Sequence, residues 1–143
     1  MNRLSEILDE KGGEVYEIDA GASVYDAVER MVDLGVGSLL VTEGGDVAGI
    51  VTERDYLRRV TLEGRTDRET CVREIMSSPL VVATPETTID ECMALMTDRR
   101  IRHVPVVEDD RVVGMVSIGD LVKFQSREQS FEIQYLTQYI TAG

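Results

Sequence analysis

Two short pieces of the sequence place a hydroxyl and a carboxylate three residues apart, where a predicted strand runs into a predicted helix. They are Thr52 with Asp55 and Ser117 with Asp120. Residues three apart at a helix start lie on one face. The hydroxyl can cap the helix while the carboxylate sits at the favourable end of the helix dipole. Alternatively, the carboxylate can accept hydrogen bonds from both hydroxyls of a ribose, with the Thr or Ser hydroxyl adding another. The residues alone leave both interpretations open.

Both pieces belong to an internal repeat, which is the strongest long-range signal in the chain. Residues 24–57 align without a gap with residues 89–122, so the offset is 65 positions (89 against 24). The identical positions include Val41 with Val106, Gly49 with Gly114, Val51 with Val116, and Asp55 with Asp120. A register that keeps a glycine, a hydroxyl and an aspartate at the same spacing twice is hard to obtain by chance.

The hydrophobic patterns predict the order β-α-β-β-α in each repeat. The expected elements are strands 15–18, 38–42 and 47–52 with helices 24–34 and 53–62, then helix 89–96, strands 101–107 and 111–116, and a helix from 119. Short helical lead-ins are expected at 4–8 and 72–76. One repeat is too small to bury a core alone. The expected fold class is therefore α/β (α+β), with two repeats related by a pseudo-twofold axis and two equivalent clefts between them.

The expected boundaries divide the chain into two repeats, a connector and a tail. The first repeat with its lead-in takes residues 1–63, the connector 64–71, the second repeat with its lead-in 72–125, and a helical tail 126–143. The tail is rich in large apolar residues: Phe131, Ile133, Tyr135, Leu136, Tyr139 and Ile140. Packing against a partner or second copy and packing against its own module both stay open.

The charge balance excludes several kinds of partner. Twenty-seven acidic residues face fifteen basic ones, which gives a net charge of −12 in 143 residues. A phosphate backbone or an anionic membrane needs a basic footprint, so neither is an expected partner. An acidic surface and a salt-loving host both explain the excess. No apolar run approaches the ~20 residues that span a bilayer, and no signal peptide is visible, so a cytoplasmic location is expected.

The sequence has few residues that would indicate an enzyme or a metal-binding protein. The chain has one His and two Cys residues, Cys71 and Cys92, without a CxxC pair. We expect neither a metal site nor a disulfide, and we interpret both cysteines as small buried residues. No nucleophile–base set and no paired acids point to an enzyme.

Together these features resemble a tandem pair of CBS domains (cystathionine-β-synthase-type domains), the Bateman module. The resemblance covers residues 15–124 and rests on the twice-repeated Gly-h-h-Thr/Ser-x-x-Asp piece (h is apolar), on strand 102–107, and on the β-α-β-β-α order. Members of the family bind adenosine nucleotides in the clefts between repeats, where the motif Asp holds the ribose. The resemblance implies that Thr52 with Asp55, and Ser117 with Asp120, are the two ribose sites.

The same resemblance implies that the adenine lies against the opposite repeat. The residues expected opposite Asp55 are Thr84, Ile101, Arg102 and His103, and those expected opposite Asp120 are Ile18, Ala20, Val36 and Ser38. Arg54, Arg102 and His103 give the Asp55 cleft a phosphate-binding character, because charge-assisted contacts suit a phosphate. The neighbouring Arg99 and Arg100 are also explained by the favourable helix C-terminus. The Asp120 cleft is expected to hold little charge and to take a nucleoside-like ligand or none.

These observations predict a non-catalytic adenosine-nucleotide sensor of the AMP, ADP or ATP class. Ligand binding is expected to change the shape of the module, and a separate effector protein or a second copy would sense the change. No cofactor is required beyond the regulatory nucleotide, and a homodimer is expected. Two alternatives stay open: a binder of S-adenosylmethionine or NAD(H), and a dimerisation module whose nucleotide clefts are vestigial.

Overall fold

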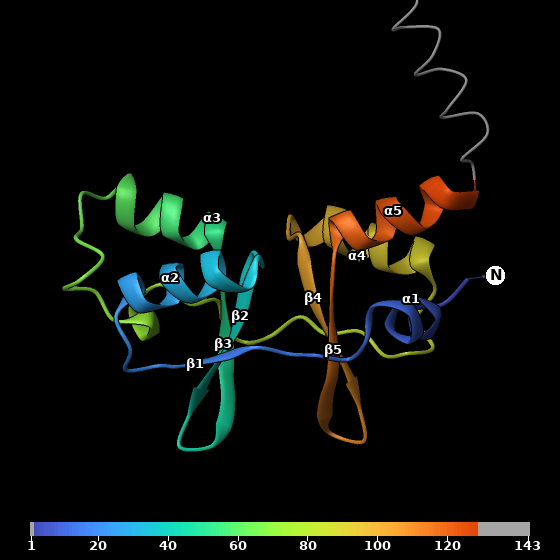
Figure 1. The fold of residues 1–143 in the computed structure, drawn as a ribbon, viewed down its shortest axis with the longest axis horizontal. Coiled ribbons are helices and arrows are strands. Elements are labelled where there is room, and N and C mark those ends of the chain that lie inside the picture. Colours follow the sequence, from blue (N-terminus) through green and yellow to red (C-terminus); the bar gives the residue numbers. More distant parts are fainter. Residues whose placement is uncertain (1, 129–143) are drawn as a thin grey trace, which may run out of the picture. The chain divides into compact units, whose positions relative to one another are not determined.

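The computed structural model describes residues 2–128. The chain divides into two compact units, which we name by their place in the sequence. The middle unit is Glu14–Val81, and among the described residues the terminal unit combines 2–13 with 82–128. Most of the predicted tail 126–143 lies outside the described residues. Figure 1 shows one β-hairpin in each unit, formed by β2 and β3 in the first and by β4 and β5 in the second. The mixed α/β class and the two-repeat organisation predicted from the sequence are confirmed.

The middle unit is built on a three-stranded sheet in the order β1-β2-β3. β1 (Glu17–Asp19) pairs in parallel with β2 (Ser38–Glu43), which pairs antiparallel with β3 (Asp46–Thr52). α2 (Val24–Leu34) connects β1 to β2, and α3 (Glu53–Tyr56) follows β3. The closing helix predicted at 53–62 is only partly α-helical, because Leu57–Thr61 forms a π-helical turn. That wider turn buries Val60 in the core and leaves Leu57 exposed. A 3-10 turn, Val72–Glu74, completes the unit.

The terminal unit repeats this plan with small changes. α4 (Ile89–Arg99) precedes the antiparallel pair β4 (His103–Glu108) and β5 (Arg111–Ser117), and α5 (Ile118–Glu128) follows. In place of a first strand, a single parallel bridge joins Ala83 to Val106. Both hairpins carry a register shift at the same repeat position, Val41/Thr42 and Val106/Val107.

The tight turns of the two hairpins need left-handed backbone at two positions. The first hairpin meets this need with Gly44 and Gly45, at φ 63° and 88°. The second places Asp109 and Asp110 there, at φ 52° and 63°. Asp tolerates this region better than most residues with a side chain, because its short polar group can hydrogen-bond locally. The two turns thus have the same backbone conformation despite their different residues.

The lead-in segments are exchanged between the repeats. α1 (Leu4–Lys11) precedes the first repeat, yet Leu4 and Ile7 are buried in the core of the terminal unit, among residues of the second repeat. Val72 and Ile75 precede the second repeat, yet they are buried in the core of the middle unit. The compact units therefore divide the chain differently from the predicted boundaries 1–63 and 72–125. The apolar side chains of each lead-in are buried in the core of the unit that holds the other repeat, although that repeat is not the next one in the sequence.

The repeated glycine of each motif lies under the exchanged lead-in. A Cβ at Gly49 would lie 2.6 Å from the Ser77 carbonyl oxygen, and a Cβ at Gly114 would lie 2.5 Å from a methyl carbon of Leu8. At Gly49 the neighbour is backbone, so β3 needs glycine where the lead-in crosses it; at Gly114 the neighbour is the flexible end of the Leu8 side chain, which can shift. Packing within the middle unit thus explains the motif glycine at position 49, while Gly114 leaves room for the present position of Leu8.

We predict that Leu4→Ala destabilises the terminal unit and spares the middle one. Removing a fully buried leucine leaves a cavity and costs about 2–5 kcal/mol of unfolding free energy. Hydrogen exchange should therefore speed up in β4 and β5, while β2 and β3 stay protected as in the wild type. Asp9→Ala, on an exposed position of the same helix, is the matched control. Faster exchange in β2 and β3 alone would contradict the exchanged lead-ins.

Candidate functional site

Both predicted hydroxyl–carboxylate pairs form capping boxes at the junction of a strand and a helix. The last residue of β3, Thr52, caps α3: its Oγ1 accepts a hydrogen bond from the Asp55 N–H at 3.2 Å, and its own N–H donates to Asp55 Oδ2 at 2.9 Å. The last residue of β5, Ser117, makes the same two bonds with Asp120, at 3.1 Å and 2.8 Å. The capping interpretation is therefore confirmed at both motifs. It satisfies helix N–H groups that would otherwise lack partners.

The capping hydrogen bonds leave acceptor capacity on the carboxylates of both Asp55 and Asp120. The backbone bond falls on Oδ2 in each case, and a carboxylate has room for about four acceptor contacts. Oδ1 of Asp55 accepts a long hydrogen bond, 3.4 Å, from the hydroxyl of Ser77. The capping box fixes the orientation of the aspartate, and the second oxygen stays available to an outside donor. Helix capping and ribose binding are thus compatible uses of the same side chain.

The loops before β2 and β4 are hydrogen-bonded to the strand–helix junctions in the same way. The Glu53 N–H donates to the Gly37 carbonyl at 3.1 Å, and the Ile118 N–H donates to the Arg102 carbonyl at 2.8 Å. In the strand register, Ser38 pairs with Thr52 and His103 pairs with Ser117. Each motif therefore has the opening residue of the neighbouring strand directly beside it, within its own unit.

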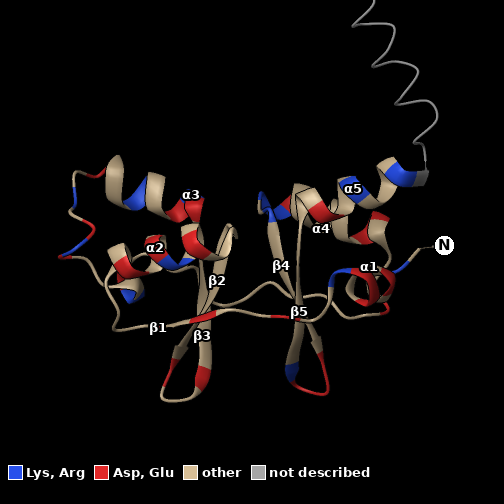
Figure 2. Cartoon of the chain, in the orientation of Figure 1, with Lys and Arg blue, Asp and Glu red and all other residues tan. Residues whose placement is uncertain are grey.

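The remaining predicted site residues divide between the units. The middle unit holds Ile18, Ala20, Val36, Ser38, Thr52, Arg54 and Asp55, and the terminal unit holds Thr84, Ile101, Arg102, His103, Ser117 and Asp120. Ala20 and Ser38 are almost completely buried. Figure 2 shows basic segments where α4 leads into β4, which is the run that includes Arg102. The predicted pairing of each ribose site with residues of the opposite repeat stays a prediction.

Lys11 is a site residue that the sequence did not reveal. Its ammonium donates to Asp120 Oδ2 at 2.8 Å and to the Met115 carbonyl at 2.8 Å. The side chains of Lys11 and Asp120 are 38% and 24% exposed, so the pair is partly screened from solvent. The two residues are 109 positions apart. Nothing in the spacing of the motif indicates this contact, which depends on the packing of α1 in the terminal unit.

The environment of Asp120 controls its protonation. Burial raises the pKa of the carboxyl, but the hydrogen bonds from Lys11 and Ser117 and the charge of Lys11 outweigh burial, so the pKa of Asp120 lies below its usual value. The carboxylate is therefore held in its ionised form, which is the form that accepts hydrogen bonds from a diol.

The terminal unit has a charged pocket beside Asp120, formed by residues of α1 and α5. A pocket of about 170 Å³ beside Asp120 is lined by three cations, two acids and two apolar residues: Lys11, Lys123, Arg127, Glu10, Asp120, Ile7 and Phe124. The sequence comparison of the two repeats missed this because the cations come from α1 and from later positions of α5. The predicted difference in charge between the two clefts stays a prediction.

The described residues show neither a metal cluster nor a membrane-spanning element. Between residues 2 and 128, no group of three or more His, Cys, Asp or Glu side chains could hold a metal ion. Within the same range, no helix is both long and apolar enough to cross a bilayer. Cys71 and Cys92 are both free thiols. Burial raises the pKa of Cys92 to about 11, so this thiol stays protonated and acts as a small apolar core residue.

We predict that Asp120→Asn flattens the acid side of the stability profile. The folded pKa of Asp120 lies below the ordinary value of 3.8, so the ionised carboxylate stabilises the fold above that value. The contribution is lost as the pH falls through the folded pKa. Between about pH 5 and about pH 2, the wild type should lose more unfolding free energy than the variant, as measured by denaturant titration.

Asp110→Asn, in the exposed turn between β4 and β5, is the matched control and should keep the wild-type slope. If the Asp120→Asn variant loses as much free energy as the wild type over that range, the stabilising role of the Lys11–Asp120 pair is refuted.

Comparisons with known proteins agree with this architecture. A mitochondrial CBS domain-containing protein of Arabidopsis thaliana, CBSX3, is 47% identical over 126 residues, covering 85% of this chain. The chain spans 61% of the length of that relative. A putative signal-transduction protein with CBS domains from Burkholderia ambifaria has a solved structure that covers 90% of this chain and 96% of its own, at 44% identity and a TM-score of 0.87.

A further solved structure is a hexameric CBS-CP12 protein from bloom-forming cyanobacteria. It is 31% identical, with a TM-score of 0.77, and the match covers 85% of this chain and 70% of that one. The CBS domain pattern itself matches twice, at residues 6–62 and 72–127. Both matches span a capping box and its glycine. The chain therefore belongs to the CBS domain family, as a tandem pair of these regulatory domains.

Proposed function

We propose that this protein is a non-catalytic regulatory module that binds an adenosine nucleotide through the carboxylates of Asp55 and Asp120. One observation carries the proposal: the same capping box occurs at the same position of both repeats, and in each the carboxylate keeps acceptor capacity toward the outside. A single capping box would be explained by helix stability alone. Family membership supports the regulatory class, and the AMP, ADP or ATP class follows from the resemblance.

The ligand contacts follow from the chemistry of the two sites. Asp55 and Asp120 accept the ribose hydroxyls, and Thr52 and Ser117 hold the carboxylates in place. Arg54, Arg102 and His103 are the proposed phosphate partners at Asp55, because charge-assisted hydrogen bonds to phosphate are stronger than neutral ones. S-adenosylmethionine and NAD(H) share the adenosine group and are alternative ligands at the same carboxylates.

The proposed output is a change of shape or rigidity that an effector protein or a second copy senses. A ligand can shift such an equilibrium only by its different affinity for the two states. No covalent chemistry is needed, because binding alone supplies the free energy. A cytoplasmic location stays a prediction; the plant relative carries a mitochondrial designation of its own.

Titration calorimetry with AMP, ADP, ATP, S-adenosylmethionine and NADH tests the proposal. Asp55→Ala should weaken AMP binding about ten- to a hundredfold, because charge-assisted hydrogen bonds to the ribose are lost. Asp33→Ala, an exposed acid on α2 of the same unit, is the charge-matched control. Thermal unfolding of each variant verifies that it is folded, since Asp55 also caps α3.

Two results would reject the proposal. One is a wild-type protein that binds none of the five ligands; the vestigial-cleft alternative would then hold. The other is equal binding by Asp55→Ala, Asp120→Ala and Asp33→Ala. Hydrogen exchange with and without saturating ligand separates a switch from a passive binder: in a switch, protection extends beyond the residues that touch the ligand.

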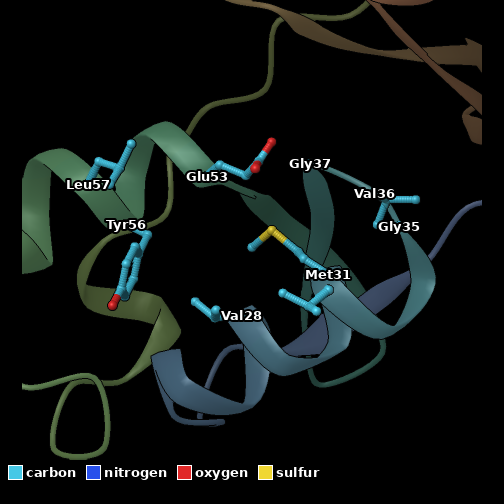
Figure 3. A pocket seen from close by; sticks show the side chains of 9 residues that line it. Val28, Met31, Gly35, Val36, Gly37, Glu53, Tyr56 and Leu57 are labelled. Atoms are coloured by element: carbon cyan, nitrogen blue, oxygen red, sulfur yellow. The ribbon is translucent and has the colours of Figure 1, made fainter.

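The predicted homodimer has a candidate surface in the middle unit. Figure 3 shows a groove of about 420 Å³ between α2 and α3, with Val28 and Met31 on one side and Tyr56 and Leu57 on the other. At its edges, Val32 is 73% exposed and Leu57 is 56% exposed. Large apolar side chains gathered at one groove mark interaction surfaces. We propose that a second copy covers this groove, since the cyanobacterial relative is itself an oligomer and tandem pairs of the family often associate through their helices.

We predict that Leu57→Asp shifts the protein to a monomer. Placing a charge in a closed apolar contact leaves it without water or a partner, which strongly disfavours association. Light scattering should give the wild type a mass near twice the chain mass of 15.9 kDa at micromolar concentration, and the variant a mass near one chain. Val47→Asp, at a 41%-exposed position of the hairpin, is the control and should stay dimeric. A monomeric wild type would refute the homodimer.

A further inference from the structure

Both lysines of the chain line the same pocket. Thirteen of the fifteen basic residues are arginines, and the two lysines are Lys11 and Lys123. They come from α1 and α5, 112 positions apart (123 against 11), and they meet beside Asp120 in the pocket of about 170 Å³. Figure 2 shows basic segments along α5, opposite the largely acidic α1. In a protein of net charge −12, this local gathering of cations calls for an explanation.

The pocket is formed by one face of each helix. Along α5, the lining residues are spaced i, i+3, i+4 and i+7: Asp120, Lys123, Phe124 and Arg127. Along α1 they are spaced i, i+3 and i+4: Ile7, Glu10 and Lys11. Residues at these spacings lie on a common helix face. Lys123 and Arg127 therefore lie on the α5 side of the pocket and Lys11 on the α1 side, and all three line the same space.

The hydrogen bonds within the pocket involve only some of the N–H donors of Lys11 and Arg127. Lys11 has three N–H donors and spends two, on Asp120 and Met115. Arg127 binds the Glu10 carboxylate through Nη2, which leaves Nη1 and Nε for other acceptors. Its guanidinium also lies 5.7 Å from the centre of the Phe124 ring, which restricts its position. Among residues 2–128, Lys123 makes no ion pair.

The charges in the pocket favour an anion that carries several acceptors. The pocket contains three cations and two carboxylates. Asp120 forms an ion pair with Lys11, and Glu10 forms one with Arg127. Within residues 2–128, no ion pair is formed by the third cation, Lys123. A phosphate monoester offers three terminal oxygens and up to two negative charges, so it can accept from Lys123 and from the remaining donors of Lys11 and Arg127 at once. Phosphate also suits lysine, which binds it as a compact point charge.

We propose that Lys11, Lys123 and Arg127 form a phosphate subsite beside the ribose-binding carboxylate of Asp120. The ligand of this second site is then a phosphorylated ribonucleoside and not a bare nucleoside. The inference rests on the proposed function for its ribose contact, and it adds the phosphate recognition that comparison of the two repeats did not predict. Lys11 has a double role: it holds Asp120 ionised and offers its third donor to the phosphate.

Amine labelling tests the subsite directly, because the chain offers only these two side-chain amines besides the N-terminus. The full-length wild type is labelled with an amine-reactive acetylating reagent in the presence of AMP, adenosine or inorganic phosphate, and the label at each lysine is measured by mass spectrometry. We expect saturating AMP to slow labelling of Lys123 about tenfold and adenosine to leave it unchanged. Protection by inorganic phosphate alone at the AMP concentration would mean an anion site without ribose recognition, and would overturn the proposal.

Calorimetry on variants gives a second readout that does not depend on reactivity. Lys123→Gln should weaken binding of AMP at the Asp120 site about tenfold and leave adenosine binding unchanged. Arg111→Gln removes the same charge from an exposed position of β5 in the same unit and is the matched control. Lys123 lies on the exposed side of α5, so this variant is expected to fold as the wild type does.

The outcomes separate this inference from the proposed function. If AMP binds and Asp120→Ala weakens it, but Lys123→Gln behaves as Arg111→Gln and labelling is not slowed, the phosphate subsite is refuted while the nucleotide-binding function stands. If the wild type binds no nucleotide at all, both are refuted. If AMP slows labelling of Lys123 and the two variants differ as expected, the second site recognises a phosphorylated ligand.

Discussion

The packing of each lead-in across the glycine of a β-hairpin is the constraint on which the rest of the structure depends. The lead-in of each repeat completes the core of the unit that holds the other repeat, and it packs against Gly49 or Gly114. A Cβ at Gly49 would meet backbone, and one at Gly114 would displace the end of the Leu8 side chain. Each hairpin strand that carries such a glycine ends three residues later in the capping residue, Thr52 or Ser117. The position of the motif carboxylate is therefore set by core packing before any ligand is considered.

Under the proposed function, each capping carboxylate would serve both helix stability and ligand recognition. A carboxylate that had to be ordered on ligand binding would spend part of its interaction free energy on lost side-chain freedom. Here one oxygen is held by the backbone N–H of Thr52 or Ser117, so the side chain is already oriented. Substituting either aspartate consequently changes two properties together. A loss of binding has meaning only beside a measurement of folding, which is why charge-matched controls in the same unit are needed.

Sequence analysis predicted the repeat, the order of the elements and both hydroxyl–carboxylate pairs, because these depend on periodicity and local spacing. It did not predict the exchanged lead-ins: the apolar stripe of α1 shows that a face is buried but not which core receives it. The contact between Lys11 and Asp120 was missed as a direct consequence. The π-helical turn at Leu57–Thr61 was missed because the same apolar spacing suits an α-helix.

The two carboxylates differ in the chemical character of their neighbour, and this difference has consequences for ligand binding. Asp55 has the neutral hydroxyl of Ser77 beside it, while Asp120 has the ammonium of Lys11. A ligand that approaches Asp120 meets an ion pair, which salt screens and acid weakens. A ligand that approaches Asp55 meets a hydroxyl that neither condition changes. Lys11 also lies two residues before Gly13, where the chain leaves the terminal unit for the middle one. Of the two motifs, only the one at Asp120 is thus joined by an ion pair to α1, close in sequence to the point where the chain leaves the terminal unit.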